Sequence, residues 1–273
     1  MLSSAFAVEK VDAEGNIDAR RSGPEEALVA LAELGGVAGV VVVVAVRGVV
    51  AVDVRVVLRE ECAQRHAAEQ RQIDFFCRDL DYEVEFVAVD TTQQQVIYDD
   101  RSLTVETLPL EHRVHCCGYL FREKPSLPHI RRDVADFYGI PVSQFHNIKA
   151  GAGWTTEEGE VVAHERLVEP AEQPRSYAYV SDTRYMPSLA DRLQGVSTLY
   201  HESTYGEDNL QMAQKYNHST AHQAALVARQ AGVGQLLLGH YSSRYEREEI
   251  LLEEAREVFE NSRLTNEMDV FDV

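Results

Sequence analysis

The sequence has little cysteine, and its four cysteines show neither a disulfide framework nor a Cys-x-x-Cys metal knuckle. Two of them, Cys116 and Cys117, are adjacent. We therefore expect a protein of a reducing compartment, the cytoplasm. The chain also shows no charged opening segment followed by an apolar core and a small-residue cleavage site, so no secretory signal is predicted.

Long hydrophobic runs are also missing. The most apolar stretch, Leu34–Val52, is interrupted by Arg47, and the remainder is too short to span a bilayer. We interpret this stretch as buried strand, and we predict no membrane partner.

Positive charge is scarce as well, since 26 Lys and Arg residues face 45 Asp and Glu residues and give a net charge of -19. An acidic surface repels phosphate, which excludes a protein that attracts nucleic acid over its whole surface. Any polyanionic partner must bind a local basic patch. The hydrophobic content of 45% is enough for a globular core.

The first 72 residues carry little information, because they consist largely of Val, Ala, Arg, Glu and Gly, with Lys10 as the single lysine. Within them, Pro24–Leu34 has helical spacing and ends at a glycine pair. Val46–Val56 alternates polar residues with valines, which predicts a half-buried strand.

From Ile73 onward the pattern is that of an α/β protein. Three strands of an antiparallel or mixed sheet are predicted first, at Tyr82–Val89, Gln95–Tyr98 and Leu103–Leu108. Later strands alternate with helices, which is typical of a layered architecture. These predicted elements are strands at Ser176–Val180, Thr198–Tyr200 and Gln235–Leu238, and helices at about Thr220–Ala231 and Glu246–Phe259.

A basic, proline-marked segment interrupts this pattern after Leu120 and leads into a short helix through Tyr138. We interpret it as an excursion from the core. Its basic residues are suited to contact phosphate groups, although a solvated surface loop explains them too. The candidate contacts are Lys124, Arg131 and Arg132.

Three predicted strands end in residues that commonly bind metal ions: His112, Asp182 and His240. The carboxyl ends of strands are where open α/β sheets bind ligands. Two imidazoles and one carboxylate at the same sheet edge suit zinc or a similar divalent ion. Taken alone, each residue has a simpler explanation, namely a hydrogen-bonded structural histidine or a turn-forming aspartate.

Two further residues are candidates for acid–base chemistry. His218 lies immediately before a helix that Ser219 or Thr220 can cap, at a point that favours an anionic oxygen. Glu202, at the end of the preceding strand, can orient that imidazole, or it is simply a capping or surface acid. Arg244, four residues after His240, can support the loop or hold a substrate phosphate.

These motifs together resemble ribonuclease Z, the family of metallo-β-lactamase-fold endonucleases that remove the 3′ trailer from precursor tRNA. The resemblance covers about residues 73–273. The residues that carry it are Ser181-Asp182-Thr183, His201-Glu202-Ser203-Thr204, His218-Ser219-Thr220, Gly239-His240 with Arg244, and the His-x5-Gly-Tyr element from His112 to Tyr119.

The resemblance implies a single α/β domain, the αββα sandwich of the metallo-β-lactamase fold, with an arm-like excursion at about residues 120–150. It implies two zinc ions per subunit, with His112, Asp182 and His240 as ligands and His218 and Glu202 as an accessory catalytic pair. It also implies a cytoplasmic homodimer that acts on precursor tRNA, in which the arm grips the tRNA.

The chain departs from the family in one respect: the motif His-x-His-x-Asp-His, which supplies most ligands of the zinc pair, is absent. The one histidine before His112 is His66, and no aspartate or second histidine accompanies it at ligand spacing. Either half of the site is lost, or the first 72 residues come from out-of-frame translation of a GC-rich gene. Two rival functions follow, another metallo-β-lactamase-fold phosphodiesterase and a non-catalytic relative.

We predict that the purified chain binds no more than one zinc ion, weakly, and hydrolyses precursor tRNA far more slowly than proteins with the full motif, because three ligands hold one ion at best. A graft of a family-type amino-terminal segment should raise both metal content and activity. Elemental analysis checks the stoichiometry, and two tightly held zinc ions per chain would show that His66, His115 or an acid supplies the missing ligands.

Overall fold

The structure, a computed structural model, describes residues 89–266, 269–271 and 273, together with the strands β1 to β5. These five strands are β1 (Ala5–Phe6), β2 (Ala27–Glu33), β3 (Val40–Val46), β4 (Asp53–Arg59) and β5 (Val84–Val89). Side-chain surroundings are described from Val89 onward.

The first sheet has the strand order β1-β2-β3-β4-β5. The valine-rich run forms β3, as predicted, and pairs antiparallel with both β2 and β4. The helix predicted at Pro24–Leu34 is wrong, because Ala27–Glu33 form strand β2. All seven residues of β2 pair with β3, so pairing with a β-branched neighbour overrides a weak helical spacing. Of the predicted strand Val46–Val56, residues 47–52 lie outside the described residues.

The second sheet is the larger one, with the order β16-β15-β14-β13-β8-β7-β6. The strands β13 to β16 are parallel to one another, and the register pairs Glu202 at the end of β14 with Gly239 at the end of β15. Its strands are β6 (Val96–Asp99), β7 (Leu103–Leu110), β8 (Cys116–Glu123), β13 (Ser176–Val180), β14 (Thr198–Glu202), β15 (Gln235–Gly239) and β16 (Ser262–Leu264).

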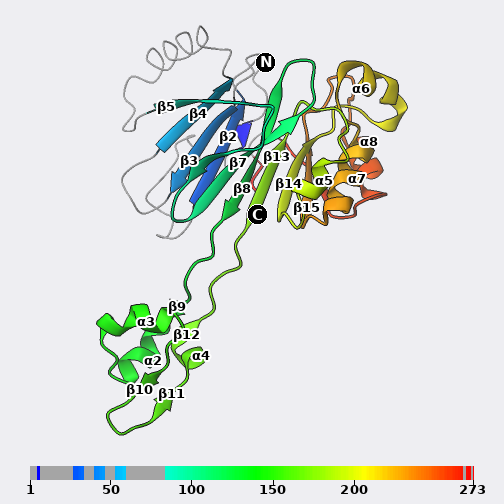
Figure 1. Cartoon of the computed structure of the whole chain (residues 1–273). Coiled ribbons are helices and arrows are strands. Elements are labelled where there is room, and N and C mark those ends of the chain that lie inside the picture. Colours follow the sequence, from blue (N-terminus) through cyan, green and yellow to red (C-terminus); the bar gives the residue numbers. More distant parts are fainter. Residues whose placement is uncertain are drawn as a thin grey trace, which may run out of the picture. The chain divides into compact units, whose positions relative to one another are not determined.

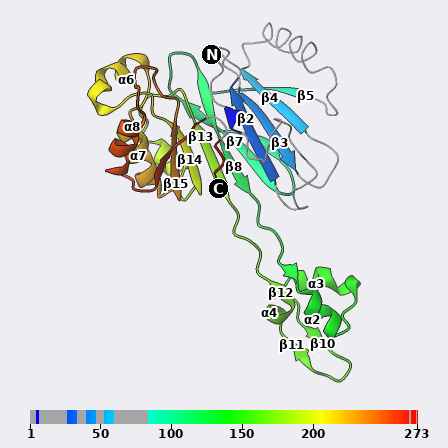
Figure 2. The ribbon, with the colours of Figure 1, turned by 180° about the vertical axis from the view of Figure 1, so that it is seen from behind.

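Helices α5 (Leu189–Arg192), α7 (Ala221–Ala231) and α8 (Glu249–Arg256) cover one face of this sheet (Figures 1 and 2). The core between them is aliphatic and rich in alanine, which lets α7 lie close to β14 and β15. Helix α7 begins with a capping box from Thr220 to Gln223 and ends at Gly232 in the left-handed conformation, close to the predicted bounds. A short 3-10 turn, η3 (Glu207–Asn209), and α6 (Leu210–Tyr216) precede it.

A second compact unit comprises Asp100–Thr104 and Arg122–Arg175. It has its own small hydrophobic core, in which Ile148 and Leu167 are buried. Its elements are β9 (His129–Ile130), α2 (Arg132–Phe137), η2 (Val142–Gln144), α3 (Phe145–Lys149), β10 (Trp154–Thr155), β11 (Val161–Val162), α4 (His164–Leu167) and β12 (Val168–Glu169). The excursion predicted at about residues 120–150 overlaps this stretch of sequence, which extends to Arg175.

The two chain segments that bound this second unit are joined by a bidentate ion pair. The guanidinium group of Arg175 donates to the carboxylate of Glu123, with the closest N–O distance 2.6 Å. The backbone N–H of Glu123 also donates to the carbonyl of Arg175 at 2.9 Å. Because the contact is double, it fixes the register of the outgoing and returning segments.

The structure confirms the predicted α/β class, with two large sheets, two small two-stranded sheets in the second unit, and strands and helices alternating from β13 onward. No helix in the part of the chain that the structure describes is both long and apolar enough to cross a membrane.

Close packing explains why the His-x5-Gly-Tyr element has a glycine at position 118. A Cβ atom at Gly118 would collide with the backbone carbonyl oxygen of Tyr179, and backbone atoms of a central strand cannot move aside cheaply. The ring of Tyr179 is itself buried and stacks on that of Tyr200, with 4.8 Å between centroids.

We predict that Gly118→Ala lowers the free energy of unfolding by about 1–3 kcal/mol, the usual cost of overpacking a core. Val96→Ala in β6 of the same sheet is the control, because Val96 is 56% exposed and its truncation should change stability by less than about 0.5 kcal/mol. Urea unfolding of both variants measures the difference. Equal stability of the two would mean that the strands around Gly118 can shift.

Candidate metal centre

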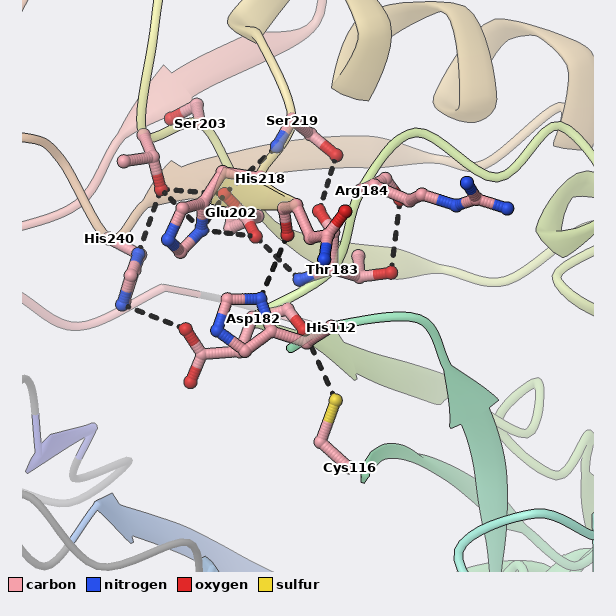
Figure 3. Close-up of polar contacts among 12 residues, drawn as sticks. His112, Cys116, Asp182, Thr183, Arg184, Glu202, Ser203, His218, Ser219 and His240 are labelled. Atoms are coloured by element: carbon pink, nitrogen blue, oxygen red, sulfur yellow. Dashed lines mark hydrogen bonds and ion pairs between the residues drawn. The ribbon is translucent and has the colours of Figure 1, made fainter. Parts of the chain in front are cut away.

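The carboxyl ends of neighbouring strands bring five predicted residues together. His112 follows β7, Asp182 follows β13, Glu202 ends β14 and His240 follows β15, while His218 comes from the loop between α6 and α7. Figure 3 shows the rings of His112, His218 and His240 in one cluster with the carboxylate of Asp182. The centroid of His218 lies 4.8 Å from that of His112 and 5.4 Å from that of His240.

The backbone is strained at this cluster. Among the described residues, three non-glycine residues have a positive φ: Asp182 at 55°, Asn217 at 57° and His240 at 57°. Two of these are predicted metal ligands, and the third precedes His218. Left-handed backbone costs free energy for a residue with a side chain, so it persists only where the surroundings impose it and is enriched at functional sites.

Each of the three imidazoles is held through its Nδ1 atom. His112 Nδ1 donates to the carbonyl oxygen of Asn217 at 2.9 Å, and His218 Nδ1 lies 3.0 and 3.1 Å from the two carboxylate oxygens of Glu202. His240 Nδ1 lies 2.9 Å from the hydroxyl oxygen of Thr204. Because Nδ1 is engaged in all three rings, Nε2 is the nitrogen that each ring leaves for a ligand.

Glu202 is fully buried and is the acceptor around which the cluster is organised. Besides His218, it accepts hydrogen bonds from the backbone N–H of Thr183 at 2.6 Å, the hydroxyl of Thr204 at 2.6 Å and the backbone N–H of Ser219 at 3.1 Å. Burial opposes ionisation, but the hydrogen bond and charge of His218 outweigh it and hold the pKa of Glu202 below its ordinary value. Burial likewise disfavours the charged imidazole, but Glu202 raises the pKa of His218.

The donor set fits a divalent metal ion. Ligand atoms of His112, Asp182 and His218 lie within 4.8 Å of one another. Asp182 Oδ1 is also 3.3 Å from His240 Nε2. Imidazole nitrogens with a carboxylate oxygen are typical ligands of zinc. A second possible group joins Glu202 to His218 and His240, but both oxygens of Glu202 already accept hydrogen bonds.

Several supporting residues escaped the sequence analysis. Asn217 acts through its backbone carbonyl, which leaves no signal in the side chain. Thr204 links Glu202 to His240, and its place in His-Glu-Ser-Thr was the available clue. The thiol of Cys116 donates to the backbone carbonyl of Asp182 at 3.2 Å and so supports its strained conformation.

The predicted substrate-binding residues have contact partners of their own. Arg244 donates to the side chain of Asn209 at 3.1 Å and lies over the ring of Tyr205, which in turn meets His218 edge-on. Three others belong to the second unit and already have partners there. Lys124 donates to the carbonyl of Asp100, Arg131 lies 3.5 Å from Asp133, and Arg132 lies over the ring of Phe145. Their roles remain predictions.

Three imidazoles and two carboxylates gather at the carboxyl edge of an α/β sheet, the edge at which such sheets bind ligands, and they define a candidate metal-binding protein. Comparison with known proteins gives a narrower relationship. The chain is 50% identical over 195 residues to ribonuclease Z of Bacteroides fragilis strain YCH46, a match that covers 71% of this chain and 64% of that protein. It is 48% identical over 196 residues to ribonuclease Z of Phocaeicola vulgatus, covering 72% and 63%.

The resemblance to ribonuclease Z is therefore confirmed, and the chain spans just under two thirds of the length of these curated relatives. No family model matches the chain. Among solved structures, human tRNase Z, short form, aligns with a TM-score of 0.47 and 14% identity, over 81% of this chain and 68% of that one.

We predict that Glu202→Ala destabilises the protein by about 3–5 kcal/mol, because it leaves several buried donors without an acceptor. The control is Glu111→Ala, which removes a carboxylate that is 48% exposed and paired with Arg184. An exposed pair of this kind contributes about 1 kcal/mol or less. Urea unfolding distinguishes the two, and a Glu202 variant as stable as the Glu111 variant would contradict the role assigned to Glu202.

Proposed function

We propose that this chain is a ribonuclease Z-like endoribonuclease that removes the 3′ trailer from precursor tRNA with the help of zinc. One observation carries the proposal. Five residues that the ribonuclease Z motifs single out, far apart in the sequence, lie in one cluster in a chain that is half identical to ribonuclease Z proteins over 195 residues. Cytoplasmic location is part of the same proposal.

His112, Asp182 and His240 would hold the metal in this function. A bound zinc ion supplies Lewis acidity for hydrolysis of a phosphodiester and offsets the negative charge that develops on it. The residues themselves contribute orientation, since His112 and His240 are fixed through Nδ1, and Asp182 is fixed by its strained backbone and by Cys116.

His218 and Glu202 would act as the accessory pair. Glu202 accepts a hydrogen bond from Nδ1–H of His218 and favours the charged imidazole. The Nε2 atom of His218, when it binds no metal ion, can then carry a proton for the leaving oxygen. Glu202 itself is fully buried and touches no substrate, so its part is to position His218.

The second compact unit is the candidate tRNA-binding arm. Arg131 and Arg132 lie at the start of α2, and the side chain of Arg131 is 41% exposed although it is paired with Asp133. The acidic body of the protein makes such a local basic site necessary for a polyanionic substrate. A homodimer, in which the arm of one subunit serves its partner, completes the proposal.

A non-catalytic relative is the second candidate, and the absence of His-x-His-x-Asp-His from the 273 residues favours it. A cleavage assay with a precursor tRNA and a chromogenic phosphodiester separates the alternatives. Release of the trailer supports the proposed function. Hydrolysis of the small substrate alone indicates a phosphodiesterase of another specificity, and no hydrolysis of either, with zinc supplied, indicates a non-catalytic protein.

We predict that the double variant Arg131→Gln/Arg132→Gln binds precursor tRNA more weakly and with a flatter salt dependence, because fewer counterions are released. Hydrolysis of a small phosphodiester should not change. Arg192→Gln, an exposed arginine of α5, is the control and should bind tRNA as the unmodified chain does. Filter binding at several salt concentrations measures the effect, and a parallel fall in small-substrate hydrolysis would rule out the arm.

A further inference from the structure

The side chain of His218 lies among the candidate metal ligands and also pairs with Glu202. It is one of the three residues His112, Asp182 and His218 whose ligand atoms lie within 4.8 Å of one another, and it is also the partner of Glu202. The chain lacks the motif that supplies most zinc ligands in ribonuclease Z. We propose that His218 is a metal ligand in this chain, and that it completes a single four-coordinate site with His112, Asp182 and His240.

His218 is common to the two groups of possible ligands, one with His112 and Asp182 and the other with Glu202 and His240, and so links His112 and Asp182 to His240. Among the described residues the four donors do not form one group within 4.8 Å, so a shared ion requires the side chains to close in around it. Two ligands of one tetrahedral zinc ion, each about 2.0–2.1 Å from the metal, are separated by about 3.3 Å. Asp182 Oδ1 and His240 Nε2 are 3.3 Å apart, so they need no movement to share an ion. The centroid of the His218 ring lies 4.8 Å from that of His112 and 5.4 Å from that of His240, and the three rings lie in one cluster with the Asp182 carboxylate (Figure 3).

The orientation of the rings supports the same conclusion. A zinc-bound histidine usually donates its other ring N–H to a carbonyl or carboxylate oxygen, which fixes the ring and raises its basicity. His218 has such a partner in the buried carboxylate of Glu202, and His112 has one in the carbonyl of Asn217. His218 is therefore held in the way a metal ligand is held, no less firmly than His112.

Other candidates for the fourth position are less suitable among the residues that the structure describes. Glu202 is fully buried, and both its oxygens accept short hydrogen bonds from other groups, so coordination would cost it those bonds. The thiol of Cys116 donates a hydrogen bond to the backbone carbonyl of Asp182, so it is already engaged away from the Asp182 carboxylate.

One consequence rests on the proposed function. Nε2 of His218 cannot bind an ion and carry a proton for a leaving oxygen at the same time. A chain that holds its one ion through His218 would be a poor nuclease until His218 is released, and further metal ligands supplied from elsewhere would release it. The proposed zinc site can be tested by zinc binding alone, without any measurement of activity.

Zinc competition against a chromophoric chelator tests the proposal with the metal-free full chain. Ligand loss in His218→Ala should weaken zinc binding at least about tenfold. His222→Ala, at the second residue of α7, should change it less than about twofold, because His222 is in neither group of ligands. Unchanged zinc affinity in a folded His218→Ala chain would overturn the proposal.

A second measurement needs no variant. Nitrogen NMR of the chain with labelled histidine, titrated with one equivalent of zinc, should shift the Nε2 signals of His112, His218 and His240 together. Shifts of His112 and His240 alone would overturn the proposal and leave His218 free for the accessory role in the proposed function. Absence of any zinc-dependent shift would contradict both the site and a zinc-dependent activity.

Discussion

The carboxylate of Glu202 is the interaction on which the rest of the site depends. This carboxylate is fully buried, and it accepts hydrogen bonds from four groups that come from three separate segments of the chain. A buried charge is costly unless it is fully satisfied, so these segments can take only the arrangement that supplies all four donors. The loop after β13, the end of β14 and the loop before α7 are thereby fixed together.

This constraint explains how strained backbone can persist at the site. The loop after β13 is fixed at Thr183 by Glu202 and at Asp182 by the thiol of Cys116. His240 is fixed through Thr204, which also donates to Glu202. The free energy that holds Asp182 and His240 in the left-handed region therefore comes from a hydrogen-bond network, and the strain presents their side chains to the same point.

The sequence predicted the ligand-bearing strand ends because parallel strands finish at one edge of a sheet, and the structure brings His112, Asp182 and His240 to one cluster. It could not reveal Asn217 as a partner of His112, because a backbone carbonyl has no residue type. The sequence pattern also wrongly predicted a helix at Ala27–Glu33, where pairing with a valine-rich strand outweighs helical spacing. Long-range pairing and main-chain contacts are the two influences that a linear pattern does not record.

The proposed site at this sheet edge holds one metal ion. A crystal structure of the chain grown with zinc, with anomalous data collected at the zinc edge, tests it most directly. We expect one strong anomalous peak, surrounded by Asp182 and the Nε2 atoms of His112, His218 and His240. Two peaks in the site, or no peak there while zinc is bound elsewhere, would contradict it.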